Sequence, residues 1–303
     1  MDKEIFVKKQ PKIKKFGFIN VDKPSGIVSS AVVNKLKWLT GTPCGHMGTL
    51  DPLASGVLPV GIGNATRLFD YFLDKKKVYV AEFTFGETSD TLDCTGEITR
   101  GGRVPSAEEI AAVLPEFFGE IMQMPPKYSA KNVNGKRGYE LARAGIDFEL
   151  QPKKIRIDNM TLLGKSEGKD DAYRVEIECG GGTYIRSIGR DIAERLGTNA
   201  LMSALRRKQS GVFTETEAVP FERILDENLT LDELESFIVP TESVLPYETL
   251  VLTAKNWEKI FNGVAVWTDA ADGFYKFYNV NGSFYGIAEV VAGKAKLKTK
   301  LCQ

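Results

Sequence analysis

A segment rich in glycine and proline, residues 41–56, restricts the fold of this chain more than any other part of it. Proline lacks a backbone donor and glycine weakens helices and strands alike, so the segment is predicted to be a long loop. A helix is expected before it, over about 29–39, and a buried strand after it, over 57–63. Asp51 lies within the loop, directly before Pro52. An Asp-Pro pair is typical of a turn, but an acidic side chain on a loop held by a rigid scaffold is also typical of a functional site.

Strand-like and helix-like patterns alternate through the first 240 residues. Apolar residues at every second position predict a strand at 77–86, and Ser106 with Glu109 forms a capping-box pattern ahead of a helix. The expected strands are 17–26, 57–63, 77–86, 153–163, 172–179 and 201–208, and the expected helices are 29–39 (capped by Ser29 or Ser30), 65–73, 107–118, 137–145 and 184–196 (ended by Gly197). The pattern predicts a chain of mixed helix and sheet.

The pattern of expected helices and strands changes at about residue 245. A helix is expected near 254–261, and two alternating runs follow it, joined at Asn281 and Gly282, which is a strong hairpin signal. We therefore predict a basic N-terminal tail at 1–15, a main domain at 16–240 and a small β-rich domain at 241–303.

The formal net charge is zero, with 40 basic and 40 acidic residues, but the charges are not evenly spread. Residues 1–40 hold nine lysines and three acidic residues, 120–145 hold five basic and two acidic, and 183–211 hold six basic and two acidic. Residues 212–240 hold one basic and eight acidic residues. Basic segments set apart from an acidic one are compatible with an anionic ligand such as RNA, although solvated surface patches have the same appearance.

Histidine and cysteine usage excludes several classes of site. His46 is the only histidine, and the four cysteines at 44, 94, 179 and 302 are far apart in sequence. A zinc site with several histidines, a CxxC knuckle and a disulfide framework are therefore not expected. No signal peptide and no apolar run long enough to span a membrane is apparent, so we expect a cytoplasmic protein.

One dinucleotide-like motif is incomplete. Gly61 and Gly63 follow a strand and open a helix, and Glu82 lies about 20 residues downstream, but Thr66 stands where the third glycine belongs. A nicotinamide- or flavin-dependent enzyme is therefore a weak alternative, and no P-loop or G-x-S-x-G motif occurs.

The loop sequence G-H-M-G-T-L-D-P-L-A-S-G-V-L, residues 45–58, closely resembles the catalytic motif of the TruB family of tRNA pseudouridine synthases. Four further segments resemble motifs of that family in the same order: D-K-P-S-G at 22–26, K-V-Y-V-A at 77–81, P-P-K-Y-S-A at 125–130 running on to 143, and G-T-Y-I-R-S at 182–187 with Arg190 and Asp191. The resemblance covers about 15–215. It implies a pseudouridine synthase fold of the α+β class, with a mixed, largely antiparallel sheet and flanking helices, and a small C-terminal β-rich (PUA-like) domain.

The resemblance also implies roles for residues of the reaction site. Asp51 is the nucleophile, Arg186 is its partner, and Tyr79 stacks on the flipped uracil and is a candidate acceptor for the C5 proton. Whether Asp51 attacks C1′, attacks the base or assists loss of the 2′ proton stays open. Tyr184 and Leu205 are expected to line the uracil pocket, with core packing as the alternative for each.

Other residues are implied in binding RNA. His46 is expected to stack in the gap left by the flipped uridine. Lys23 and Pro24 shape the pocket, and an insertion at about 125–145 grips the T-arm of tRNA through phosphate contacts from Lys127, Lys131, Lys136, Arg137 and Arg143.

The function expected from the resemblance is isomerisation of uridine 55 in the T-loop of tRNA, without guide RNA, cofactor, metal, membrane or obligate protein partner, by a monomer. A guide-directed relative acting on ribosomal RNA is disfavoured, because the chain carries the insertion and has no long basic tail. A catalytically idle RNA-binding module is disfavoured because Asp51, Tyr79 and Arg186 are all present.

Overall fold

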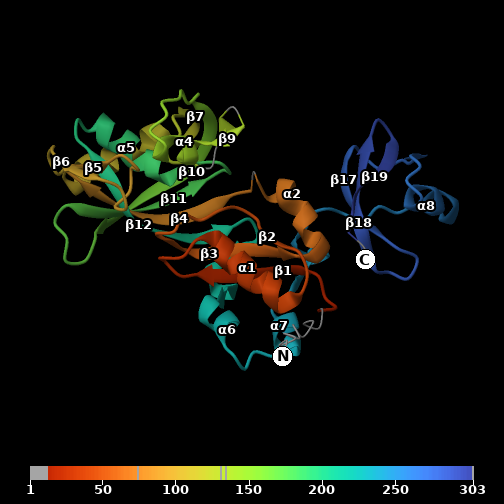
Figure 1. The fold of residues 1–303 in the computed structure, drawn as a ribbon. Helices are drawn as coiled ribbons and strands as arrows, with labels where there is room; N and C mark the ends of the chain where they lie inside the picture. The colour runs from red at the N-terminus through yellow and green to blue at the C-terminus, as the bar shows by residue number, and fades with distance from the viewer. Residues whose placement is uncertain (1–12, 74, 130–131, 134, 302–303) are drawn as a thin grey trace, which may run out of the picture.

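A sheet of eleven strands forms the centre of the molecule. The structure, a computed structural model, describes residues 13–73, 75–129, 132–133 and 135–301 (Figure 1). The main strand order is β14-β1-β3-β12-β4-β11-β10-β7, with β2 beside β3, β13 beside β12 and β15 beside β1. These strands are β1 (Gly17–Lys23), β2 (Cys44–His46), β3 (Ala54–Ile62), β4 (Lys77–Phe85), β7 (Gly119–Gln123), β10 (Lys153–Lys165), β11 (Ala172–Cys179), β12 (Ala200–Ser210), β13 (Phe213–Thr214), β14 (Val219–Pro220) and β15 (Val239–Pro240).

The pairing is mostly antiparallel. Only β1 with β14 and β12 with β3 run parallel within this described sheet. The expectation of an α+β fold with a mixed, largely antiparallel sheet is therefore confirmed. Two small hairpins lie outside the sheet, β5 (Glu87–Ser89) with β6 (Ile98–Arg100) and β8 (Asn132–Val133) with β9 (Lys136–Arg137).

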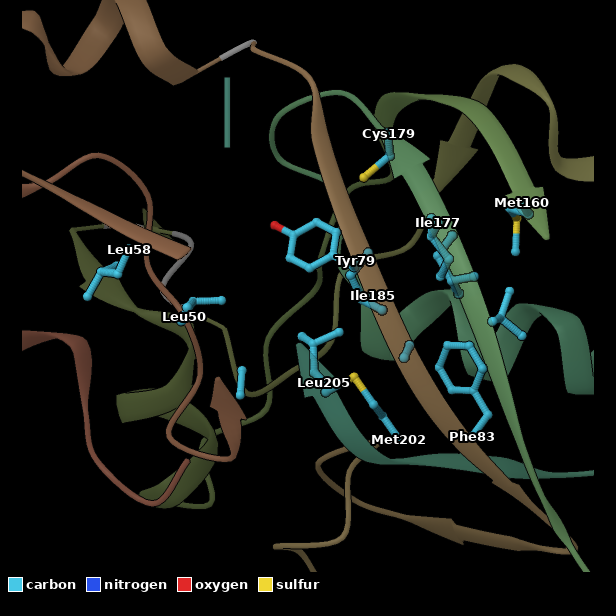
Figure 2. Close-up of a cluster of buried hydrophobic side chains, with 14 of the residues drawn as sticks. Leu50, Leu58, Tyr79, Phe83, Met160, Ile177, Cys179, Ile185, Met202 and Leu205 are labelled. Atoms are coloured by element: carbon cyan, nitrogen blue, oxygen red, sulfur yellow. The ribbon is translucent and has the colours of Figure 1, made fainter. Parts of the chain in front are cut away.

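Helices flank the sheet. They are α1 (Ser29–Thr40), α2 (Phe69–Leu73), α3 (Ala107–Val113), α4 (Gly138–Arg143), α5 (Ile185–Arg195), α6 (Phe221–Leu225) and α7 (Leu231–Ser236), with 3₁₀ turns at Gly63–Leu68, Leu114–Phe117, Glu215–Glu217 and Thr241–Val244. The main core joins the sheet to α1, α3, α5, α6 and α7, and Figure 2 shows part of it, with Ile185 of α5 near strands of the sheet. Ile185, Ile188 and Ile192 form the buried stripe of α5 at helical spacing. A Cβ at Gly189 would lie 2.5 Å from the ring of Phe83, so glycine at this position lets α5 lie close to β4.

Several predicted elements need correction. The segment 41–56 is not one loop, because β2 forms within it and β3 begins at Ala54. Ser29 does not cap α1; Val28 is the N-cap residue, without a side-chain cap, and the Ser29 hydroxyl bonds the backbone of Leu50 instead.

Two predicted helices are broken. Residues 65–73 form the end of a 3₁₀ turn followed by the short α2. The helix predicted at 107–118 is α-helical only as far as Val113 and continues as a 3₁₀ turn at Leu114–Phe117, where Pro115 has no backbone N–H to donate. The capping box of Ser106 with Glu109 is confirmed, as is the left-handed Gly197 after α5.

The C-terminal residues form a second, four-stranded sheet of order β16-β19-β18-β17 with one helix, which confirms a β-rich region there (Figure 1). Its elements are α8 (Ala254–Phe261), β16 (Val266–Trp267), β17 (Gly273–Tyr278), β18 (Phe284–Val291) and β19 (Lys294–Lys300). Two hydrogen bonds tie β19 to α2 and the 3₁₀ turn before it. Arg67 Nη1 donates to the Lys300 carbonyl at 2.8 Å, and the hydroxyls of Tyr71 and Thr299 lie 2.9 Å apart. The division at 240/241 stays a prediction. Within the described ranges, no helix has the length and apolar character needed to cross a membrane.

Gly56 offers a test of how tightly the sheet is packed beside the loop. Its φ is +100°, and a Cβ there would lie 2.3 Å from the carbonyl oxygen of Arg207 on β12. Gly164 has nearly the same φ, +101°, but no atom within 4 Å of the added Cβ. We expect Gly164→Ala to lower the free energy of unfolding by about 1–2 kcal/mol through backbone strain alone. Gly56→Ala should cost about 1–3 kcal/mol more, because β3 and β12 must also separate.

Urea denaturation of the two variants and the wild type measures this difference. Equal losses for the two alanine variants would show that the close approach at Gly56 is not tightly held.

Candidate active site

The loop around Asp51 is held by the segment that joins β1 to α1. The Ser29 hydroxyl donates to the Leu50 carbonyl at 2.8 Å and accepts from the Leu50 amide at 2.9 Å. The Gly26 amide donates to the Pro52 carbonyl at 2.8 Å. Backbone bonds on both sides of Asp51 therefore fix its position, so residues 22–29 act as a clamp on the loop that carries Asp51.

Lys23 lies inside this clamp. Its side chain is 0 % exposed, and its ammonium group donates to the carbonyls of Pro24 at 2.9 Å and Ile27 at 2.8 Å, with Pro52 at 3.4 Å. Burial lowers the pKa of Lys23 to about 8, while the negative charge of Asp51 acts in the opposite direction. Lys23 and the half-buried Pro24 thus shape the loop, and the lysine has no exposed surface for a phosphate.

Arg186 joins two carboxylates at the N-terminal end of α5. Its Nε lies 3.0 Å from Asp51 Oδ2, and its Nη1 lies 3.2 Å from Asp93 Oδ2. The same guanidinium donates to the carbonyls of Thr91 at 2.9 Å and Tyr128 at 3.0 Å. Arg186 is 8 % exposed, whereas the Asp51 side chain is 35 % exposed. The buried Arg186 guanidinium thus holds the more exposed Asp51 carboxylate in one orientation.

Asp93 is a residue of this site that sequence reasoning missed. Its Oδ1 accepts from the Thr91 hydroxyl at 2.8 Å and the Thr95 amide at 3.0 Å, which leaves Oδ2 for Arg186. The available signal was an acidic residue in a Thr-Leu-Asp-Cys-Thr-Gly turn, residues 91–96, which is weak without a structure.

Tyr79 and Leu205 lie beside the loop on neighbouring strands of the sheet. Both are 8 % exposed and belong to the same apolar cluster as Leu50. In Figure 2 the phenol oxygen of Tyr79 points away from Phe83 and Ile177, toward the side on which Leu50 and Leu58 lie. Burial raises the pKa of the Tyr79 phenol, and the charge of Arg207 opposes this. Tyr79 is therefore a neutral phenol near pH 7.

His46 ends β2 and pairs with Val60 of β3. It is half-buried, and its Nδ1 has no hydrogen-bond partner among the residues that the structure describes. Burial, and next the charge of Arg207, lower the pKa of His46, so the imidazole is neutral near pH 7.

Tyr184 is the N-cap residue of α5, and its backbone is bracketed by the side-chain amide of Gln123 at 2.9 and 3.1 Å. The predicted insertion residues are only partly visible. Lys127 is exposed, 3.6 Å from Asp147, and Arg143 is exposed at the end of α4. Lys136 and Arg137 form β9, whose side chains are not described, and Lys131 lies outside the described residues.

The basic segment 183–211 is not a free basic surface. Arg186 and Arg207 are buried. The other four cations form ion pairs: Arg190 with Asp191 and Glu194, Arg195 with Glu116, Arg206 with Asp22 and Glu215, and Lys208 with Glu176 and Glu215. The sequence-level interpretation of this stretch as a surface facing RNA is not supported by these pairings.

The dinucleotide alternative loses its support. Glu82 is bonded to Lys169 Nζ and the Ser203 hydroxyl, each at 2.7 Å. A Cβ at Gly61 would lie 2.7 Å from Met47 Cε, and one at Gly63 would lie 2.1 Å from the ring of Phe16, so packing explains both glycines. Within the described ranges, no three His, Cys, Asp or Glu side chains lie close enough together to hold a metal ion.

Comparison with known proteins assigns the family. Residues 37–185 match the N-terminal domain of the TruB family pseudouridylate synthases, and residues 186–246 match the tRNA pseudouridylate synthase B C-terminal domain. The chain belongs to the TruB family of pseudouridylate synthases. The curated relatives include tRNA pseudouridine synthase B of Shouchella clausii, 38% identical over 94% of this chain and 98% of the relative, and that of Clostridium acetobutylicum, 38% identical over 90% and 95%.

Solved structures agree on the TruB-family fold. The chain is similar to a Cbf5-Nop10-Gar1 complex, with a TM-score of 0.68 and 24% identity over 95% of this chain and 84% of that chain. It is also similar to an H/ACA RNP bound to a substrate RNA containing 2′-deoxyuridine, with a TM-score of 0.69 and 20% identity over 97% and 93%. The expected pseudouridine synthase fold is thereby confirmed.

The buried Lys23 predicts a specific dependence of stability on pH. The unfolded chain, in which lysine titrates near 10.5, binds more protons than the folded protein between pH 8 and 10.5. The penalty for burying the charged lysine is therefore full below pH 8 and fades as the pH rises. We expect the free energy of unfolding of the wild type to rise relative to that of Lys23→Met, by up to about 1.4 kcal/mol per pH unit between pH 8 and 10.5.

Urea denaturation of both proteins at pH 7, 8, 9 and 10 checks this expectation. A stability difference that is the same at pH 7 and pH 10 would contradict a depressed pKa for Lys23.

Proposed function

We propose that this TruB-family protein converts uridine 55 in the T-loop of tRNA to pseudouridine, without a guide RNA and with Asp51 as the nucleophile. The observation that carries the proposal is the Asp51–Arg186 ion pair. It orients a carboxylate that is accessible, on a loop that hydrogen bonds to Ser29 hold in place. The names of the relatives, tRNA pseudouridine synthase B, support tRNA as the substrate.

The chemistry is an isomerisation. The N1–C1′ bond of the uridine breaks, the detached uracil turns, and a bond forms between C5 and C1′. The C5 proton is lost and N1 gains a proton, so the composition of the nucleotide does not change. The sugar gains cationic character when the base departs, and a fixed carboxylate stabilises or traps that charge. Attack at C1′, attack on the base and removal of the 2′ proton all require Asp51 to point at the nucleotide, which Arg186 ensures.

Tyr79 and Leu205 supply the surface on which the uracil lies. A uridine inside a folded T-loop must leave its stack before Asp51 can reach it, and a flat apolar surface compensates part of that cost. Because Tyr79 is a neutral phenol, stacking is its main role, and it is a candidate acceptor for the C5 proton only once its own proton has been removed.

Asp51→Asn tests the nucleophile. Asparagine keeps the shape of the side chain but lacks the negative charge, so we expect the single-turnover rate on unmodified tRNA transcript to fall by about 1000-fold or more. Asp170→Asn is the matched control, because this carboxylate is fully exposed on the turn between β10 and β11. Carbodiimide adducts mapped by primer extension report pseudouridine at each position.

A primer-extension stop at the T-loop uridine with the wild type and with Asp170→Asn, but not with Asp51→Asn, is the expected result. A stop at another uridine would overturn the T-loop assignment. Full activity of Asp51→Asn would remove Asp51 from its role.

His46 gives a second test. A neutral imidazole acts by stacking, so His46→Phe should keep most of the modification rate on folded tRNA, while His46→Ala should lower it by about tenfold or more. Rates at limiting enzyme for the two variants measure the difference. If the alanine and phenylalanine variants are equally slow, a flat ring at position 46 is not what matters.

A further inference from the structure

Two adjacent arginines on β12 have opposite environments. Arg206 is on one face of the strand, 38 % exposed, where it forms ion pairs with Asp22 at 3.0 Å and Glu215 at 2.8 Å. Arg207 is on the other face and 1 % exposed. Successive side chains of a strand point to opposite faces, so the same residue type is placed once at the surface and once under the reactive loop.

The strand register places Arg207 between the two halves of the site. Arg207 is opposite Tyr79 of β4 on one side and Gly56 of β3 on the other. The absence of a side chain at Gly56 lets the backbone of Arg207 approach β3. The side chain thus enters the space between Tyr79 and the loop that carries Asp51.

The guanidinium is held by backbone oxygens. Nε donates to the Val57 carbonyl at 2.7 Å and Nη2 to the Gly48 carbonyl at 3.0 Å, and Nη1 lies 3.4 Å from the Thr49 carbonyl. Arg207 is also the strand partner of Tyr79, and its proximity to the phenol lowers the pKa of that group against the effect of burial. One side chain therefore connects the loop residues before Asp51 with the tyrosine.

No carboxylate among the described residues forms an ion pair with Arg207, in contrast to Arg186 with its two aspartates. Arginine is not deprotonated in proteins, and an unpaired buried charge is destabilising. A buried positive charge beside the loop that carries Asp51 is explained if the charge serves the reaction.

We propose that Arg207 is a positioning residue for pseudouridine formation, which fixes the Tyr79 phenol against the Gly48–Thr49 backbone and places a positive charge beneath the departing uracil. This inference rests on the proposed function. When the N1–C1′ bond breaks, both electrons leave with the base, so the detached uracil carries a negative charge until C5 bonds to C1′. Arg207 is on the side of Tyr79, where that charge develops, and Arg186 is on the side of Asp51, where the sugar becomes cationic.

The test compares the same substitution at neighbouring positions. Arg207→Gln keeps donors but removes the charge, Arg207→Lys keeps the charge without the planar fork, and Arg206→Gln is the matched control. Single-turnover rates and Kd for unmodified tRNA are measured in the wild-type and Tyr79→Phe backgrounds, with thermal melting to verify folding. We expect Arg207→Gln to lower the rate at least about tenfold with Kd within about twofold, because the buried side chain does not touch RNA. Arg207→Lys should recover part of the rate, and Arg206→Gln should stay within about twofold of the wild type.

The double variants separate positioning from a general structural role. If Arg207 acts through Tyr79, the loss from Arg207→Gln shrinks in the Tyr79→Phe background; a structural role gives the same loss in both. A folded Arg207→Gln protein with the wild-type rate overturns the inference, and equal losses in the two backgrounds overturn the part of it in which Arg207 positions Tyr79. If Arg207→Gln does not fold, Arg207→Lys decides by the same comparison. A wild type that forms no pseudouridine on tRNA contradicts the proposed function instead.

Discussion

The proposed reaction site depends on one buried cation, Arg186, that is shared between two carboxylates. A buried charge is tolerated only where its hydrogen-bonding groups are matched, and Arg186 has Asp51, Asp93 and the carbonyls of Thr91 and Tyr128 around it. Because Asp93 is itself fixed by its own turn, the arginine cannot follow Asp51 if the loop moves. The carboxylate is therefore oriented by the more rigid partner, as a preorganised site requires.

The rest of the fold brings these groups together. The close approach of α5 at Gly189 fixes where its first turn lies, and with it Arg186. The clamp at 22–29 fixes the loop from the other side, and Arg207 fixes the loop from below. Arg186 forms ion pairs with described carboxylates, while the buried Lys23 and Arg207 are held by carbonyls. A site with more buried positive than negative charge suits a reaction in which a base leaves with an electron pair.

The sequence predicted best those helices and strands whose ends are determined by nearby residues. The strand 172–179 and the helix 254–261 were predicted with the bounds that the structure has, because each has a clear periodicity and clear ends. The pairing of Asp51 with Arg186 was anticipated only from the family resemblance, since 135 positions of chain separate the two. Asp93, the hydroxyl of Ser29 and the burial of Arg207 were missed for the same reason. Arg186, Leu50 and the carbonyl partners of Arg207 lie far in sequence from the residues that they contact, and the position of Ser29 is also typical of a helix cap.

Charge patterning misled in a way that the structure explains. The cations of 183–211 are either buried in the site or paired with acidic side chains, which for Arg190 lie in the same segment and for the other paired cations lie elsewhere in the chain. Their sum in sequence therefore says little about the surface. The acidic stretch 212–240 forms α6 and α7, which lie on the opposite side of the sheet from α4 and β9 in Figure 1. Zero net charge therefore does not by itself argue against an RNA substrate, because ion pairs such as Arg206 with Glu215 neutralise part of both stretches inside the protein.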